Sequence, residues 1–144
     1  MAAARIELLG ESDCQTLDAE LVERLYEFNA HTTGCGDGRL VGGALRGDGG
    51  ELLAGFSGHT WGGVCVVSHL WVAESLRGRG WGHALLASAE AEAARRRCVH
   101  LILATHSFQA PKFYEACGYE RLGAIEDWPL GHANIFYRKT LAAG

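Results

Sequence analysis

The sequence predicts a single α/β (α+β) domain in which helices flank a mixed, mostly antiparallel sheet. Three observations favour this fold class. The chain has 144 residues, which is enough for one domain with a true core and leaves little room for a second. Apolar or alternating segments typical of strands fill much of the first half. Helical periodicity precedes these segments and returns after a glycine-rich turn, so helices and strands mix along the chain.

The first expected element is a helix over residues 13–30. Ser12 and Gln15 resemble a capping box at its start, in which two side chains satisfy free amides of the first turn. Apolar side chains then recur at helical spacing, which predicts an amphipathic helix with one apolar face. These side chains belong to Leu17, Leu21, Val22, Leu25 and Phe28.

Three strands are expected next, over residues 39–46, 51–60 and 62–72. More than half of the 20 glycines lie between residues 34 and 63, and many of them occupy the corners between these segments. Gly-Asp-Gly-Gly at 47–50 and Trp-Gly-Gly at 61–63 are typical turn sequences. Short connections join neighbouring antiparallel strands, so the sequence predicts a three-stranded meander.

The second half begins with a helix over 80–97, which is rich in alanine and is expected to be the longest and best formed. A strand over 99–104 follows. A short helix over 110–117 is expected to end at Gly118, because glycine favours the left-handed conformation that closes a helix. Two further strands, over 119–125 and 132–141, complete the chain.

The composition excludes several classes of function. Hydrophobic residues make up 48% of the chain, yet no apolar run approaches the roughly 18 residues needed to span a bilayer. The first residues lack the basic and apolar segments of a secretory signal, so we expect a cytoplasmic protein without a membrane partner. The net charge of -4 disfavours a nucleic-acid partner. The five cysteines are odd in number and form no Cys-x-x-Cys pair, which favours free thiols.

A glycine turn between a strand and a helix is the most informative segment. It consists of Arg77-Gly78-Arg79-Gly80-Trp81-Gly82. The first turn of a helix carries amides without intrahelical partners at the positive end of the helix dipole, which suits it to bind anions. Glycine lets a phosphate approach the main chain closely. The spacing matches neither the triphosphate P-loop nor the dinucleotide motif. The alternative is a turn that only packs the helix on the sheet.

This turn resembles the signature of the GNAT superfamily of acetyl-CoA-dependent N-acetyltransferases, with Arg77, Gly80 and Gly82 at the signature positions. The resemblance continues through 107–119, where Phe-Tyr and Gly-Tyr look like the family's second motif. A tighter resemblance is to small bacterial members with Phe-Gln-Ala-Pro-x-Phe-Tyr, here 108–114, and Asp-x-Pro-x-Gly-His, here 127–132. The resemblance covers nearly the whole chain and implies the GNAT fold, in which two central strands splay apart.

The resemblance also implies where acetyl-CoA binds. The coenzyme would lie between the splayed strands, 64–72 and 99–104. Main-chain groups of Leu70, Trp71 and Val72 would pair with its pantetheine arm as an added strand does. Ser107, where many relatives have Asn, would contact pantetheine through its hydroxyl. The diphosphate would be held around Arg77, Gly78, Arg79, Gly80, Trp81, Gly82 and His83.

Tyr114 is expected to assist the leaving group, because the family places a tyrosine in this role. A phenol has an ordinary pKa of about 10, so it is protonated at neutral pH and can donate a hydrogen bond to a thiolate. The alternative for Tyr114 is a packing role like that of Phe113 beside it.

The general base is open, because the strand 64–72 has no carboxylate where many relatives carry a glutamate. His69 on this strand and His132 in the loop 126–132 are the two candidates, since imidazoles suit proton transfer near neutral pH. On a regular strand, His69 and Trp71 share one face. The alternatives are structural roles for both histidines, with water carrying the proton away.

The resemblance implies an enzyme that moves an acetyl group from acetyl-CoA to a primary amine of a small molecule or peptide. The amine would attack directly in a ternary complex, without a covalent enzyme intermediate or a metal. The missing strand carboxylate keeps a second hypothesis open, a non-catalytic acyl-CoA-binding sensor or interaction module. Dimerisation is common in the family, so a homodimer is a further hypothesis, and no motif identifies the amine acceptor.

Overall fold

The structure is a computed structural model that describes residues 3–141. The chain forms two compact units, Met1–Gly36 and Asp37–Gly144. Among the described residues, the second unit contains all the strands. The expectation of one domain for the whole chain stays a prediction. Within the described residues, no helix is both long enough and apolar enough to cross a membrane.

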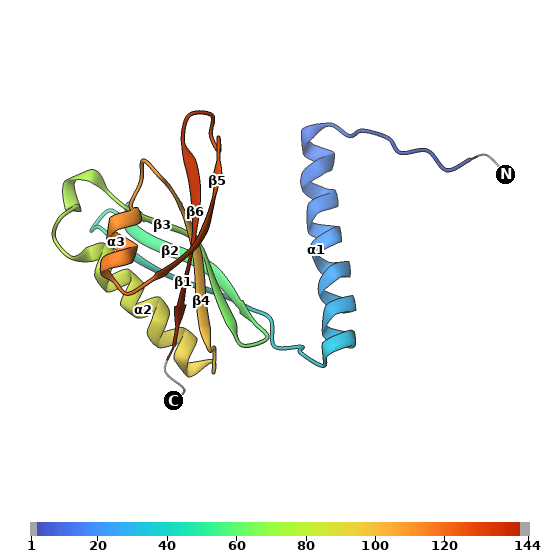
Figure 1. The fold of residues 1–144 in the computed structure, drawn as a ribbon. Coiled ribbons are helices and arrows are strands. Elements are labelled where there is room, and N and C mark those ends of the chain that lie inside the picture. The colour runs from blue at the N-terminus through green and yellow to red at the C-terminus, as the bar shows by residue number, and fades with distance from the viewer. Residues whose placement is uncertain (1–2, 142–144) are drawn as a thin grey trace. The chain divides into compact units, whose positions relative to one another are not determined.

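The first unit contains the helix α1, Glu11–Thr33 (Figure 1). It ends at Gly34, whose φ of 76° lets its amide close the last turn, as glycine commonly does at this position. Gly10 precedes the helix and makes no side-chain cap. The expected capping box of Ser12 and Gln15 is therefore wrong, because the helix begins two residues earlier than predicted and Ser12 lies inside its first turn.

The second unit is built on a six-stranded sheet with the order β1-β2-β3-β4-β6-β5. β3 and β4 run parallel, and the other neighbouring pairs are antiparallel, so the predicted mixed sheet and its meander are confirmed. The strands are β1 (Arg39–Arg46), β2 (Leu52–Trp61), β3 (Val64–Val72), β4 (His100–His106), β5 (Glu120–Glu126) and β6 (Ala133–Thr140). Each predicted strand is present and begins and ends within two residues of its expected limits.

Two α-helices connect the strands of this unit. A 3-10 turn, η1 (Glu74–Leu76), and then α2 (Trp81–Arg95) lie between β3 and β4, and α3 (Pro111–Ala116) follows β4. The expectation that the helix after the glycine turn is the longest is wrong, since α2 has 15 residues and α1 has 23. α2 ends early because Arg97 has a φ of 61°, which no right-handed helix accommodates.

α2 packs against β1, β2 and β3 and supplies much of the core. Its buried side chains are Leu85, Leu86, Ala89 and Ala93. These small and branched residues lie on one face of the helix, as expected for a helix that covers a sheet. Arg96 after its end donates hydrogen bonds to the Leu40 carbonyl and to the Thr60 hydroxyl, both at 3.0 Å, so it ties this end to the meander.

A bulge interrupts the pairing of β2 with β3. Ser68 has no partner on β2, because the register passes directly from His69 to Val67. On a regular strand over 62–72, successive side chains would point to opposite faces of the sheet. This expectation is wrong at Ser68, where the pairing register shifts by one residue. Gly58 lies opposite the bulge, and a side chain there would collide with the carbonyl oxygen of Val66. Glycine at this position permits the close approach of the two strands.

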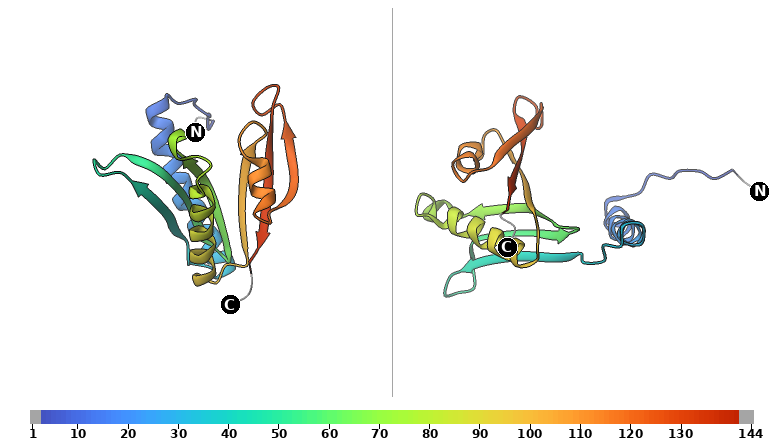
Figure 2. Two further views of the ribbon diagram at one scale, coloured as in Figure 1. Left: turned by 90° about the vertical axis from the view of Figure 1, so that its left-hand side faces the viewer. Right: turned by 60° about the horizontal axis from the view of Figure 1, so that its bottom comes forward.

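β3 and β4 separate after a short stretch of pairing, as the family resemblance implied. Val64, Cys65 and Val66 pair with residues 100–102, and the register ends there. Beyond this point β4 stays paired with β6, and β3 stays paired with β2. Figure 2 shows the two halves of the sheet joined at one end and splayed at the other. The facing edges of β3 and β4 thus carry main-chain groups free to pair with an extended ligand.

The buried thiol of Cys65 provides a test of this core at alkaline pH. Its side chain is 0% exposed, and burial, with a smaller contribution from Cys98, raises the pKa of the thiol from 9.0 to about 11. Between these pH values the unfolded chain releases the proton and the folded chain keeps it, so stability is lost as pH rises. We expect a loss of roughly 2 kcal/mol by pH 11 from this thiol, measured by urea unfolding.

Cys65→Ala is the matched variant. It lacks the thiol and should lose less stability between pH 9 and pH 11 than the wild type, even though its stability at pH 7 is lower because of the smaller side chain. Parallel pH profiles for the two proteins would contradict the prediction.

Candidate active site

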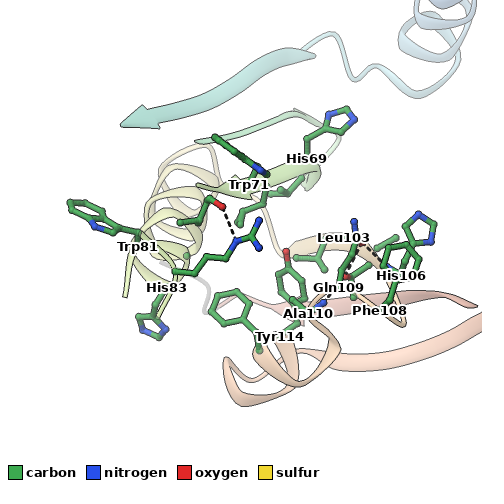
Figure 3. A pocket seen from close by; sticks show the side chains of 18 of the residues that line it. His69, Trp71, Trp81, His83, Leu103, His106, Phe108, Gln109, Ala110 and Tyr114 are labelled. Carbon is green, nitrogen blue, oxygen red and sulfur yellow. Dashed lines mark hydrogen bonds between the residues drawn. The ribbon is translucent and has the colours of Figure 1, made fainter. Parts of the chain in front are cut away.

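A slot of about 1050 Å³ lies between the separated parts of β3 and β4. Its walls come from β3, the glycine turn, the first turn of α2, the end of β4 and α3 (Figure 3). The described lining contains one arginine and three histidines but no carboxylate, an electrostatic environment that favours an anionic ligand. Trp81 and His83 lie at one end, Tyr114 in the middle, and His106 and Phe108 at the other end (Figure 3).

The glycine turn forms the first end of the slot. Gly78 and Gly80 have φ values of 74° and 86°, a region that L side chains rarely adopt. The first main-chain hydrogen bond of α2 joins the amide of Ala84 to the carbonyl of Gly80, so the amides of residues 81–83 have no acceptor within the helix. A Cβ atom on Gly78 or Gly80 would point into open space. The residues present therefore fit the diphosphate of a coenzyme.

Arg77 stabilises this turn through two hydrogen bonds. Its side-chain Nε donates to the carbonyl of Val72, the last residue of β3, at 3.1 Å. Its main-chain amide donates to the carbonyl of Glu74 at 3.3 Å. The amide of Arg77, expected to bind the diphosphate, is thus already used within η1, and the free amides lie further along the turn.

Tyr114 projects from α3 into the middle of the slot, and Figure 3 shows its hydroxyl directed between the two strands. The residue is only 6% exposed. The rings of Phe113 and Tyr119 pack against it at centroid distances of 5.1 and 6.0 Å. Burial, with a smaller effect of Cys117, raises the pKa of Tyr114 above its ordinary value of 10. The phenol is therefore protonated at neutral pH and available as a hydrogen-bond donor.

The loop between β4 and α3 is held by Gln109. Its Oε1 accepts hydrogen bonds from the amide of His106 at 2.8 Å and from the hydroxyl of Thr105 at 3.3 Å. The amide of Ala110, just before α3, donates in turn to the Thr105 hydroxyl. This network connects the end of β4, which carries His106, to the start of α3, which carries Tyr114.

Residues 6–119 match the model described as the Acetyltransferase (GNAT) family. The chain belongs to the GNAT acetyltransferase family. The match includes the glycine turn and α3, and it ends at Tyr119. The sequence resemblance and the expected fold are thereby confirmed, and the chain is an acyl-CoA-dependent acetyltransferase.

Curated relatives and solved structures agree with this assignment. The chain is 34% identical over 130 residues to an acetyltransferase of Agrobacterium fabrum, covering 89% of this chain and 95% of the relative. It is 41% identical over 96 residues to the blasticidin-S acetyltransferase of Streptomyces morookaense, covering 66% and 71%. The crystal structure of an acetyltransferase from Bacillus cereus superposes with a TM-score of 0.78 at 29% identity, covering 96% and 98%.

Most residues predicted to bind the coenzyme of this GNAT protein line the slot. The two that do not are Arg79 and Ser107. The hydroxyl of Ser107 accepts a hydrogen bond from the amide of Ala133 at 3.0 Å, and its own amide donates to the carbonyl of Ala133. Ser107 thus joins the end of β4 to the start of β6, a structural role that a local motif could not reveal.

The histidines predicted as candidate bases lie in different places. His69 lines the slot, and its Nδ1 is 3.4 Å from the hydroxyl of Ser57 on β2. His132 does not line the slot, and its ring contacts that of Phe108 edge-on at a centroid distance of 4.8 Å. Of the two candidates, only His69 is among the residues that line the slot, and the choice of base stays a prediction.

Sequence reasoning missed several polar residues of the slot, among them His106 and Asn134. Asn134 is 6% exposed and lies on β6, directly opposite His106 on β4. Neither residue belongs to a recognisable motif. The pairing of β4 with β6 brings them together, and the only available signal was the position of His106 at the end of a strand that borders the slot.

Proposed function

We propose that this protein transfers the acetyl group of acetyl-CoA to a primary amine, by direct attack of the amine on the thioester. The observation that carries the proposal is the slot, which begins at the free amides of α2 and passes Tyr114 between two separated strands. An elongated thioester with a diphosphate at one end is the ligand that such a slot suits.

In this proposal the amides of residues 78–83 hold the diphosphate. The pantetheine arm extends between the strands and pairs with main-chain groups of Leu70, Trp71 and Val72. A main-chain amide near Val72 donates to the thioester oxygen as it gains negative charge, the usual means of stabilising such an oxyanion. The acetyl group then lies near Tyr114, and the far end of the slot receives the amine.

The chemistry requires two proton movements. A lysine-like amine with a pKa of about 10.4 is mostly protonated at pH 7, so forming the neutral nucleophile costs about 4.6 kcal/mol. A group in the slot must accept that proton. The leaving thiolate must then be stabilised, and the Tyr114 hydroxyl serves this purpose as a hydrogen-bond donor. Such assistance typically contributes about 10²- to 10⁴-fold in rate.

The acceptor proposed for the first test is blasticidin S, because a relative at 41% identity is a blasticidin-S acetyltransferase. The far end of the slot supports a compact organic amine, since the stacked rings of His106 and Phe108 offer flat aromatic surfaces there. Aromatic faces attract cations and planar groups.

The test follows thiol release from acetyl-CoA with blasticidin S, spermidine, kanamycin, lysine or a short peptide, and mass spectrometry of the products. We expect release that depends on one of these amines, together with a product heavier by one acetyl group. Release without any amine, or binding of acetyl-CoA without release, would contradict the proposal and favour a hydrolase or a sensor.

A further inference from the structure

His106 is a histidine of the slot to which the proposed function assigns no proton transfer. It is the last residue of β4, and it lies at the end of the slot away from the glycine turn, beyond Tyr114 (Figure 3). The proposed function brings the acceptor amine to this end. The described slot lining contains no carboxylate, so the proton of the amine must go to an imidazole or to water.

The hydrogen bond of His106 determines which nitrogen can accept a proton. Its Nδ1 is 3.0 Å from the main-chain carbonyl oxygen of Trp128. A carbonyl oxygen only accepts hydrogen bonds, so Nδ1 must carry hydrogen. In the neutral ring Nε2 then has the free lone pair. The structure therefore presets the basic tautomer before any substrate binds.

The ring of His106 is also held in place. It stacks on Phe108 with a centroid distance of 5.4 Å and an angle of 3° between planes, and Trp128 packs against it at 6.3 Å. The main-chain amide of His106 donates to Gln109. A proton acceptor fixed by packing and hydrogen bonds loses little entropy when it acts, which favours catalysis.

The other two candidate bases lack this arrangement. His69 is bonded to the hydroxyl of Ser57, which can donate or accept, so neither tautomer is selected. His132 lies outside the slot lining. In His106 a carbonyl oxygen fixes which ring nitrogen carries hydrogen. Among the described residues, no such hydrogen bond selects the tautomer of His69 or His132.

We propose that Nε2 of His106 accepts the proton of the acceptor ammonium, an inference that rests on the proposed function. The neutral amine then attacks the thioester carbon, forming the C–N bond, and the C–S bond breaks with its electron pair leaving on sulfur. A second proton on nitrogen passes to the thiolate, whose charge Tyr114 stabilises meanwhile. His106 returns its proton to solvent, so one proton is released for each acetyl group transferred.

The first test compares His106→Asn and His106→Ala with the wild type, using the amine that the wild type acetylates fastest. Asn keeps a donor that can reach the Trp128 carbonyl but has no basic nitrogen. We expect kcat to fall at least tenfold in both variants while KM for acetyl-CoA changes less than twofold. Added imidazole should restore part of the kcat of His106→Ala. His59→Gln, at an exposed position on β2 away from the slot, is the control and should keep wild-type kcat.

A kcat of His106→Asn equal to that of the wild type would overturn the inference. So would rescue by imidazole of His69→Ala but not of His106→Ala. The second test needs no acceptor: ¹⁵N NMR of the wild type at alkaline pH should show hydrogen on Nδ1 of His106, and hydrogen on Nε2 would overturn the inference. An inactive wild type with the Nδ1 tautomer would refute the proposed function while leaving the geometry of His106 intact.

Discussion

Tyr114→Phe is expected to lower kcat by about 10²-fold or more while leaving the KM for acetyl-CoA within about twofold of the wild type. Phenylalanine preserves the ring that packs against Phe113 and Tyr119, so α3 and the slot keep their shape. Only the hydroxyl directed into the slot is lost. The departing thiolate then lacks its donor in the transition state, and steady-state kinetics with the preferred amine measures the loss.

The effect of Tyr114→Phe should also be constant with pH over the neutral and mildly alkaline range. The protonated phenol is the active form, and burial raises its pKa above the ordinary value of 10. Its deprotonation is therefore displaced to more alkaline pH, and the ratio of wild-type to variant kcat should stay level from pH 7 to about pH 9. A ratio that falls steeply across this range would contradict a donor role.

Tyr119→Phe is the matched control for this experiment. Its hydroxyl donates to Glu90 at 3.3 Å and lies outside the slot lining. The variant loses a hydrogen bond, and about 1 kcal/mol of stability with it, but should keep the wild-type kcat. Equal kcat values for wild type and Tyr114→Phe would remove Tyr114 from the chemistry.

Gly80→Asp is expected to raise the Kd of acetyl-CoA about a hundredfold relative to Gly80→Asn. Both side chains tolerate the positive φ of this position better than others do, and a Cβ there meets nothing within 4 Å. The two variants differ only in charge. A carboxylate beside a diphosphate with two negative charges opposes binding by roughly 3 kcal/mol at an intermediate dielectric. Calorimetric titration measures the difference.

The electrostatic origin of this effect can be checked by salt. The difference between the two Gly80 variants should shrink as ionic strength rises, because counterions screen charges at the surface. Thermal unfolding of both variants serves as the folding control and should give similar Tm values. Equal affinities at low salt, with both variants folded, would contradict diphosphate binding at the start of α2.

Much of the fold could be predicted because it depends on local patterns. Alternating segments and glycine corners located all six strands, and the glycine turn located the start of α2 within one residue. The errors have equally local causes. Ser12 looked like a cap because capping residues also occur inside first turns, and Arg97 ended α2 early through a backbone angle that its residue type does not announce.

For the candidate site too, some residues could be located from local motifs and others could not. Gly78, Gly80 and Tyr114 belong to short motifs, and each lines the slot. Ser107 and His132 stand in motifs too, but their side chains face the β4–β6 junction and Phe108. A motif specifies which residue types lie close together in the sequence. It does not specify the direction in which each side chain points once the strands have paired.

The amino-acid sequence by itself determined the order of strands and helices, the glycine turn before α2 and the position of the slot tyrosine, because each depends on residues close together in the chain. Only the tertiary structure decided which imidazole can act in the slot. His106, Trp128 and Asn134 come from separate segments that meet when β4 pairs with β6. The hydrogen bond that selects the basic nitrogen of His106 exists only in that arrangement, because its acceptor is a main-chain carbonyl whose position the fold sets.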